Sequence, residues 1–133
     1  MKALTILQPF AELIFIGEKL VENRTWSTSY RGELAIHAGQ SRRLVTQEDR
    51  FRFPDMPYGE IVATAMLIAC ITFDAIVAGN IPPNLQWVRY HTYTEGPICW
   101  ILDAVRPLNP PVPYKGARGL FTVDSSLLRI TDY

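Results

Sequence analysis

The chain has 133 residues, with 13 Lys and Arg against 13 Asp and Glu, so its formal net charge is zero. Hydrophobic residues make up 48% and charged residues 20%, which is the composition of a globular protein and excludes a disordered or fibrous one. Proteins that hold a long phosphate backbone usually carry a basic excess, so the neutral balance argues against strong nonspecific duplex binding. Length and composition predict a single domain spanning residues 1–133.

Cysteine content and hydropathy bear on the compartment. Cys70 and Cys99 are the only cysteines, and both lie in apolar, strand-like runs without the spacing of a zinc site. We interpret them as free thiols in a reducing compartment and expect no metal and no cofactor. The longest uncharged apolar run, residues 61–71, is too short to cross a bilayer, and polar residues interrupt the apolar N-terminus. We therefore predict a cytoplasmic protein with no membrane partner.

Short strands and helices alternate in the first half of the chain. After Gln8-Pro9, apolar residues recur at helical spacing until Gly17, a residue that commonly ends helices. In the run around His37, Leu34 and Ile36 are expected to face inward and His37 outward, as in a half-buried strand. The predicted elements are strands at residues 3–7, 20–26 and 32–38 and helices at residues 10–16 and 46–51.

The second half reads as strands around a loop-like insertion, residues 82–97. Four prolines between residues 107 and 113 predict an extended connector that cannot join a central sheet ladder. The predicted elements are strands at residues 59–73, 98–105 and 119–123, a short helix at 74–78, and a terminal helix or strand at 125–131. Five or six strands with two or three short helices predict an α+β, mostly β fold, arranged as a small mixed β-barrel.

Several motifs occur in a recognisable order. Residues 4–26 read LTILQPFAELIFIGEKLVENRTW, and RGELAIHAG begins at residue 31. This QP turn, short helix ending in glycine, G-x-K-x-[VI]-E-x-R segment and RG-x-x-x-I-H strand resemble the ASCH domain family. GEIVATAMLIACI and ICWILDAVRPLNPPVPYKGARGLFTV resemble the next long strand and the ending of small bacterial and phage-type members. The resemblance runs from Leu4 to Val123 and implies a PUA-like β-barrel that binds RNA or a related ligand.

Lys19, Glu22 and Arg24 form the sharpest group of candidate functional residues. Spacing alone favours a simple ion pair of Glu22 with Arg24 on one strand face, beside a solvated Lys19. The resemblance favours a functional role because these positions match the family's signature segment. Lys19 would then act as a base or nucleophile, Glu22 would orient it, and Arg24 would grip a phosphate or carboxylate.

Some small stand-alone ASCH proteins are amidohydrolases that deacylate N4-acetylcytidine, with a lysine, a threonine three residues later and a distant glutamate. Lys19 matches that lysine, but Glu22 stands at the threonine position. A carboxylate can serve as a base for water but does not replace a hydroxyl nucleophile. Glu60 is the candidate for the distant acid.

Other candidate ligand-binding residues surround this segment, and each has a structural alternative. Gln8 caps the first helix or reads a ligand amide, and His37 lines the cleft or bonds to backbone. Trp26 stacks on a base or covers apolar surface. The full set of predicted ligand-binding residues is Gln8, Arg24, Trp26, Arg31, His37, Lys115 and Arg118.

Two further clusters remain. The basic run with Arg42, Arg43, Arg50 and Arg52 could hold a single strand, but we interpret it as a solvated helix face whose aromatics, Phe51 and Phe53, belong to the core. The aromatic residues of the insertion, Trp87, Tyr90 and Tyr93, form a lid or cover the barrel.

The function favoured by these residues is binding of RNA or a nucleotide in a polar cleft. This cleft would be bounded by the first helix, Lys19–Arg24, the His37 strand and the Lys115–Arg118 loop. One alternative is an amidohydrolase or RNA hydrolase using Lys19 and Glu22. Another is a protein-interaction module that presents Trp87 and Tyr90.

Overall fold

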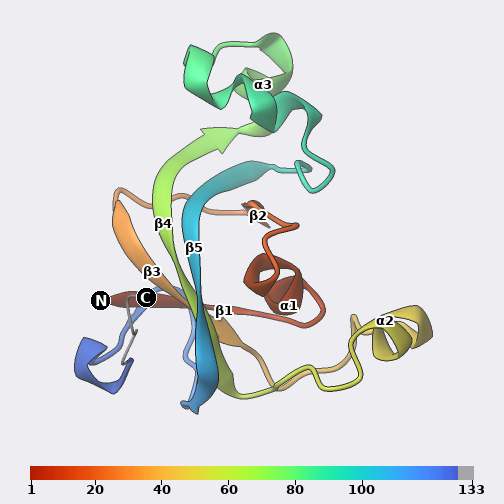
Figure 1. Ribbon diagram of the computed structural model, residues 1–133. Helices are drawn as coiled ribbons and strands as arrows, with labels where there is room; N and C mark the ends of the chain where they lie inside the picture. Colours follow the sequence, from red (N-terminus) through yellow and green to blue (C-terminus); the bar gives the residue numbers. More distant parts are fainter. Residues whose placement is uncertain (129–133) are drawn as a thin grey trace. The chain divides into compact units, whose positions relative to one another are not determined.

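The computed structural model describes residues 1–128, which contain six strands, three α-helices and two 3₁₀ helices (Figure 1). The strand order in the sheet is β2-β5-β4-β3-β1-β6. In this order β2 and β6 are at opposite ends and are not paired with each other, so the expected closed barrel is not confirmed. The elements are β1 (Lys2–Ile6), α1 (Phe10–Phe15), β2 (Val21–Arg24), β3 (Gly32–Ala38), α2 (Gln47–Arg52), β4 (Glu60–Thr72), α3 (Phe73–Ala78), η1 (Pro83–Tyr90), β5 (Ile98–Pro113), β6 (Phe121–Thr122) and η2 (Ser125–Leu127).

The chain divides into two compact units, and each has its own core. The first consists of Met1–Glu18, Glu33–Ala65 and the chain from Val105 onward. The second consists of Lys19–Gly32 and Met66–Ala104. Of the predicted terminal element at 125–131, η2 is the described part, and residues 129–131 lie outside the described residues.

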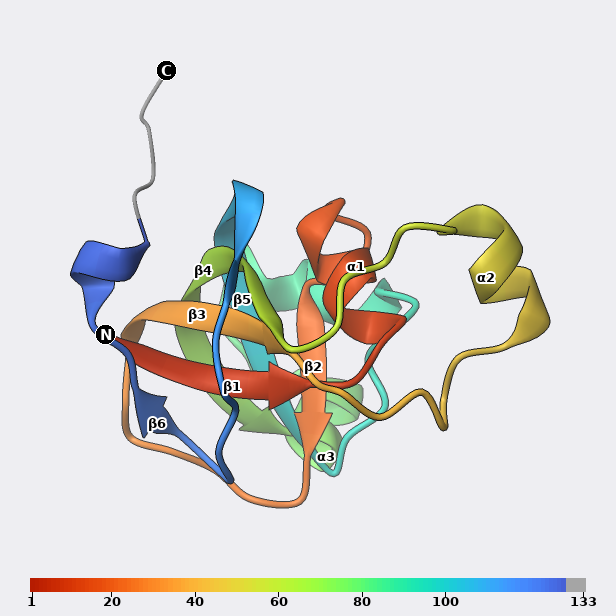
Figure 2. The ribbon, with the colours of Figure 1, turned by 90° about the horizontal axis from the view of Figure 1, so that it is seen from below.

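The first unit is built around β1. This strand pairs in parallel with β3, from Lys2 opposite Leu34 to Ile6 opposite Ala38, and antiparallel with β6 (Figure 2). Every residue from Leu34 to Ala38 is buried, so the expectation of a half-buried β3 is wrong. The physical reason is that C-terminal residues cover its second face. Ala35 shares a core cluster with Leu108 and Val123, and the His37 ring meets the edge of Phe121.

The proline-rich connector belongs to β5, which continues to Pro113. An extended conformation was predicted correctly, but the predicted end of the strand at residue 105 was wrong. β2 pairs with β5 only from Ile98 to Ile101. The later part of β5 therefore has a side without this partner, and proline is tolerated where no ladder hydrogen bond is needed.

Helix α2 also lies in the first unit, close to its predicted position. Thr46 and Asp49 form a capping box, which satisfies backbone N–H groups at the start of the helix. None of the helix residues is buried, and the Phe51 side chain is 91% exposed. The assignment of Phe51 to the core is therefore wrong. The sequence pattern could not separate this exposed aromatic from a core residue, because a six-residue helix gives too little periodicity.

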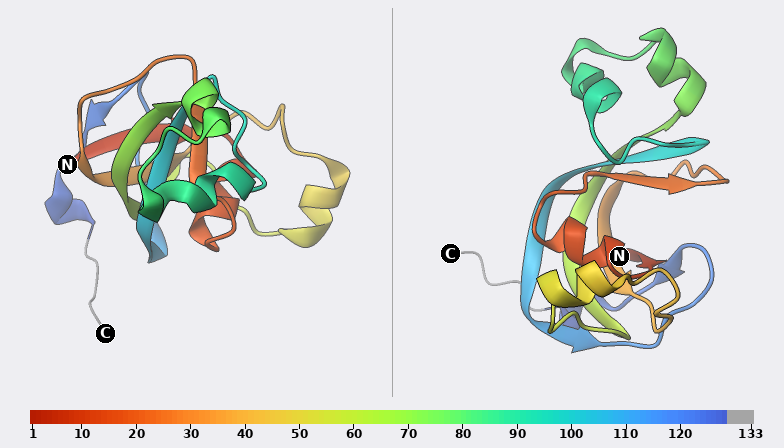
Figure 3. Two further views of the ribbon diagram at one scale, coloured as in Figure 1. Left: turned by 90° about the horizontal axis from the view of Figure 1, so that it is seen from above. Right: turned by 90° about the vertical axis from the view of Figure 1, so that its right-hand side faces the viewer.

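The second unit contains a short antiparallel pair of strands and two short helices. β2 runs antiparallel to β5, with Glu22 opposite Trp100 and Arg24 opposite Ile98. α3 starts at a Thr72 cap and ends at Gly79, whose φ of 77° is the left-handed conformation that glycine adopts readily. α3 and the 3₁₀ helix η1 lie beyond the ends of β4 and β5 (Figure 3, right). The sequence had assigned η1 to a loop.

The core of the second unit brings these elements together. Ile76 of α3 and Val88 of η1 share one apolar cluster with Val21, Cys99 and Ile101. Trp100 is fully buried, as expected. Both cysteines are free thiols: Cys99 is buried, which raises the pKa of its thiol, and Cys70 is half-buried. Among residues 1–128, no helix has the length and apolar character needed to span a membrane.

Candidate functional site

A three-residue ionic cluster lies on β2 and the turn before it. The two carboxylate oxygens of Glu22 bind different cations: Oε1 lies 3.3 Å from Lys19 Nζ, and Oε2 lies 3.0 Å from Arg24 Nη2. Strand alternation places Glu22 and Arg24 on one face, as predicted. The cluster therefore joins the three predicted residues through a single carboxylate.

Lys19 is the most buried member of this cluster. Only 2% of the residue is exposed, and Nζ also donates a hydrogen bond to the Val21 carbonyl. The prediction of a solvated Lys19 in the simple ion-pair interpretation is therefore wrong. Burial lowers the pKa of the Lys19 ammonium, and the neighbouring Glu22 carboxylate opposes this shift. Arg24 differs, since 24% of its side chain remains exposed.

A loop far along the chain, His91–Gly96, covers Lys19. The Lys19 ammonium lies 5.4 Å from the centroid of the Tyr93 ring, within range of a cation–π interaction. His91 Nε2 accepts a hydrogen bond from the Leu20 backbone N–H at 3.0 Å, so Nε2 carries no proton and the imidazole is neutral. Burial, together with the Lys19 charge, lowers the His91 pKa.

Asn23 holds the His91–Gly96 loop in place. Its Nδ2 donates to the Tyr93 carbonyl at 2.8 Å, and its Oδ1 accepts from the backbone N–H groups of Glu95 and Gly96. His91 and Asn23 were missed in the sequence. Their roles depend on contacts across about 70 residues of chain, and the only available signal was the aromatic content of the insertion.

Trp26 and Arg31 follow β2 in the same unit. The Trp26 carbonyl accepts a hydrogen bond from Trp100 Nε1 at 3.0 Å, and the two indole rings meet edge to face with centroids 4.8 Å apart. Trp26 remains half-buried. The Arg31 guanidinium is exposed and donates to the carbonyls of Thr28 and Tyr30, so it stabilises its own turn.

Gln8 belongs to the first unit and is fully buried. Its Oε1 accepts from the Glu12 backbone N–H at 2.8 Å, in the first turn of α1, and its Nε2 donates to the Pro57 carbonyl at 2.9 Å. Both ends of the amide are therefore occupied by backbone groups. This arrangement corresponds to the capping interpretation of Gln8.

His37 also makes internal contacts in the first unit. Its Nε2 lies 2.6 Å from the Tyr114 carbonyl, which makes Nε2 the donor, and its Nδ1 lies 3.0 Å from Thr5 Oγ1. Gly116 packs so closely that an added Cβ would lie 2.7 Å from His37 Cε1. The His37 strand and the Lys115–Arg118 loop thus lie side by side within the first unit, with Lys115 and Arg118 exposed.

These contacts form two groups of predicted residues. Lys19, Glu22, Arg24, Trp26 and Arg31 lie in the second unit. The first unit holds Gln8, His37, Lys115 and Arg118. A cleft shared by both groups stays a prediction.

Comparison with known proteins identifies the family. The model of the ASCH domain family matches residues 4–111 of this chain, which include all of β2 to β4 and the Lys19–Arg24 cluster. The chain belongs to the ASCH domain family.

Solved structures of this family share the fold. A crystal structure of ASCH from Zymomonas mobilis matches with a TM-score of 0.57 and 15% identity, covering 95% of this chain and 89% of the other. Two crystal structures of mutant forms of the Zymomonas mobilis protein match with TM-scores of 0.56, at 16% and 17% identity; the matches cover 95% of this chain and 89% and 91% of the others. No curated protein matched the chain. Because the sequences are only 15–17% identical, the similarity to these structures is a similarity of fold.

The segment that resembles the family's signature, Gly17–Arg24, contains the three residues of the ionic cluster. No cluster of His, Cys, Asp or Glu within residues 1–128 could hold a metal ion. The chemistry that the described site can supply is ionic and hydrogen-bonding: a buried ammonium, a carboxylate with both oxygens engaged, and a partly exposed guanidinium.

Proposed function

We propose that this ASCH domain binds RNA, or a nucleotide-sized part of it, at the face of β2 that carries Arg24 and leads to Trp26. The observation that carries this proposal is the contrast between the buried Lys19–Glu22 pair and the partly exposed Arg24. Glu22 fixes the orientation of the Arg24 guanidinium. A pre-oriented guanidinium binds a phosphate with less loss of side-chain entropy than a mobile one.

The proposal assigns different roles to the three residues. Arg24 contacts the phosphate, and Trp26, which is half-buried, offers part of its indole ring to a base. Lys19 and Glu22 act as positioning residues, because Glu22 accepts from both cations and Lys19 is covered by the His91–Gly96 loop. Neutral overall charge favours a short, locally recognised strand over a long polyanion.

Binding of a short single-stranded RNA, measured by fluorescence anisotropy, tests the proposal. Arg24→Gln should weaken binding roughly 10-fold or more, as expected for loss of a charge-assisted hydrogen bond. The matched control is Arg43→Gln, since Arg43 is an exposed arginine outside the cluster, and it should leave the affinity nearly unchanged. Equal losses in both variants, or no saturable binding by the wild type, would contradict the proposal.

Hydrolysis of a nucleoside amide or of RNA is a second candidate function. The observation in its favour is the lowered pKa of Lys19, which makes an amine easier to deprotonate, beside a carboxylate. Incubation with N4-acetylcytidine, followed by chromatography, should release cytidine in the wild type and not in Lys19→Met. Failure of the folded wild type to release cytidine excludes hydrolysis of that substrate.

Two further expectations accompany the proposal. RNA binding and two free thiols both fit a reducing, cytoplasmic location. A protein-interaction module would instead use the exposed side chains of Trp87 and Tyr90. Stable self-association without RNA affinity, measured by sedimentation, would favour that alternative.

A further inference from the structure

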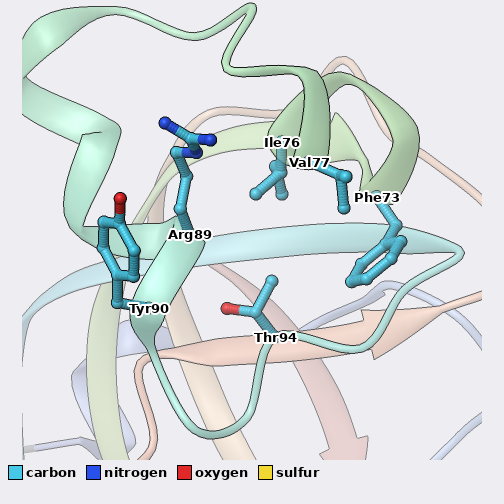
Figure 4. Close-up of a pocket in the computed structure, with 6 residues that line it drawn as sticks. All are labelled: Phe73, Ile76, Val77, Arg89, Tyr90 and Thr94. Atoms are coloured by element: carbon cyan, nitrogen blue, oxygen red, sulfur yellow. The ribbon is translucent and has the colours of Figure 1, made fainter.

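A pocket of about 250 Å³ lies between α3 and η1, in the second unit (Figure 4). Its walls differ in chemistry. α3 contributes apolar side chains, η1 contributes a cation and a phenol, and the His91–Gly96 loop contributes a threonine. The lining residues are Phe73, Ile76, Val77, Arg89, Tyr90 and Thr94. All of them lie outside Gly17–Arg24, the segment that resembles the ASCH signature.

Arg89 is a cation without an acidic partner in this pocket. No carboxylate lines the pocket, and within residues 1–128 no acidic side chain forms an ion pair with Arg89. The guanidinium carbon would lie 3.6 Å from a Cβ placed on Gly79, which locates it against the C-terminal end of α3. The guanidinium therefore lies beside the C-terminal end of α3, is exposed, and has no carboxylate partner among residues 1–128.

Tyr90 gives the pocket an exposed aromatic surface. The residue is 81% exposed, and the Arg89 guanidinium lies 5.8 Å from its ring centroid. Across the pocket, Val77 is 58% exposed and Phe73 is half-buried (Figure 4). A flat aromatic ring and an apolar wall beside an unneutralised cation match a ligand that is planar at one end and anionic at the other. A nucleotide has this chemistry, because its base stacks and its phosphate binds arginine.

We propose that the α3–η1 pocket holds one nucleotide of a single-stranded RNA, with the base between Tyr90 and the α3 wall and the phosphate on Arg89. This inference rests on the proposed RNA-binding function and adds a second contact point to it. A small aliphatic carboxylate would use Arg89 but would leave the Tyr90 ring without a role.

The His91–Gly96 loop connects this pocket to the ionic cluster. Tyr93 covers Lys19, and the next residue, Thr94, lines the pocket. The Thr94 hydroxyl donates to the Val88 carbonyl at 2.7 Å, and Asn23 donates to the Tyr93 carbonyl, so each of the two residues has its own hydrogen bond to a neighbouring element. The two proposed binding elements are therefore linked by consecutive residues of one loop.

Affinity for a short single-stranded RNA, measured with pocket variants, tests the inference. Arg89→Gln should weaken binding and reduce the slope of log K against log salt by about one. Tyr90→Leu should weaken binding about 5- to 100-fold through loss of stacking. The matched controls are Arg43→Gln and Phe51→Leu, an exposed cation and an exposed aromatic outside the pocket, and both should bind like the wild type.

The outcomes separate this inference from the proposed function. If Arg24→Gln weakens RNA binding while Arg89→Gln and Tyr90→Leu do not, the pocket assignment is wrong and the proposed function stands. If the wild type does not bind RNA, both fail. Free adenosine monophosphate binding more tightly than the RNA would overturn the assignment to a strand. Arg89 and Tyr90 are exposed, so circular dichroism should show that both variants fold.

Discussion

Glu22 is the residue on which the ionic cluster depends, because both Lys19 and Arg24 bind its carboxylate. Glu22→Gln should lower the free energy of unfolding by about 3 kcal/mol, since removing one partner of a buried ion pair leaves uncompensated charge. Urea denaturation measures this change. Asp55→Asn, at an exposed position, is the control and should change stability little. A loss for Glu22→Gln no larger than that of the control would show that the cluster is solvated.

Gly116 has a packing role that its sequence context did not reveal. The structure places it against the side chains of His37 and Thr5. Gly116→Ala should lower the free energy of unfolding by roughly 1–3 kcal/mol, because the new Cβ would overlap both side chains. The exposed neighbour Ala117 provides the control as Ala117→Ser. Unchanged stability in Gly116→Ala would mean that the Lys115–Arg118 loop does not pack on His37.

His91 should make stability depend on pH. Its pKa in the folded protein is below the ordinary value of 6.5, first because of burial and second because of the Lys19 charge. The unfolded chain therefore binds more protons at mildly acidic pH, so the free energy of unfolding should fall as pH drops below about 6.5. The stabilising contribution of neutral His91 is fully present above that pH. Thermal denaturation of wild type and His91→Gln from pH 7.5 to 5 measures the difference.

A wild-type melting temperature that falls with pH no more steeply than that of His91→Gln would assign the pH dependence to other groups. It would also show that the Leu20 N–H does not depend on neutral His91 as its acceptor.

Local sequence patterns predicted most of the regular elements. β3 occupies the predicted residues 32–38, and α3 ends at the predicted glycine. These elements have strong local signals, which are alternating apolar residues in a strand and glycine at a helix end. η1 was missed because a 3₁₀ helix has no amphipathic period of 3.6 residues. The full extent of β5 was missed because its prolines are acceptable only where the neighbouring strand has ended. Where that neighbour ends depends on the order of the strands in the sheet, which the local sequence does not show.

The His91–Gly96 loop is an element whose conformation depends on one distant side chain. Asn23→Ala should remove its hydrogen bonds to Tyr93, Glu95 and Gly96. Amide hydrogen exchange at Glu95 and Gly96 should then become faster, because their N–H groups lose the Asn23 acceptor. Asn84→Ala, at an exposed position in η1, should leave these rates unchanged. Equal exchange in both variants would show that the loop is held by other contacts.

Across the whole molecule, the sequence predicted which residues form the ionic cluster better than it predicted how buried they are. The pairing of Glu22 with Arg24 follows from strand alternation and was predictable. The burial of Lys19 was not, because it is produced by Tyr93 and His91, which the chain brings back after about 70 residues. For Gln8 and His37 the sequence left a ligand role and a structural role open. The structure pairs Gln8 with backbone groups of Glu12 and Pro57, and His37 with the Tyr114 carbonyl and the Thr5 hydroxyl. Such long-range pairings leave no periodic signal in the sequence.

The neutral molecule offers its proposed ligand two local features: Arg24 on β2, and the α3–η1 pocket with Arg89. Over the whole chain, the 13 Lys and Arg residues are balanced by 13 Asp and Glu residues. Binding should therefore be confined to a few phosphates, and its salt dependence should be shallow.

Titration of the isotopically labelled protein with a short single-stranded RNA, followed by two-dimensional NMR, tests the proposed RNA-binding face most directly. We expect the largest shifts at the backbone amides of Glu22–Trp26 and at the indole N–H of Trp26, with further shifts at Arg89–Thr94 and little change in α2. Shifts confined to α2, or no shifts at saturating RNA, would contradict the proposed RNA-binding face.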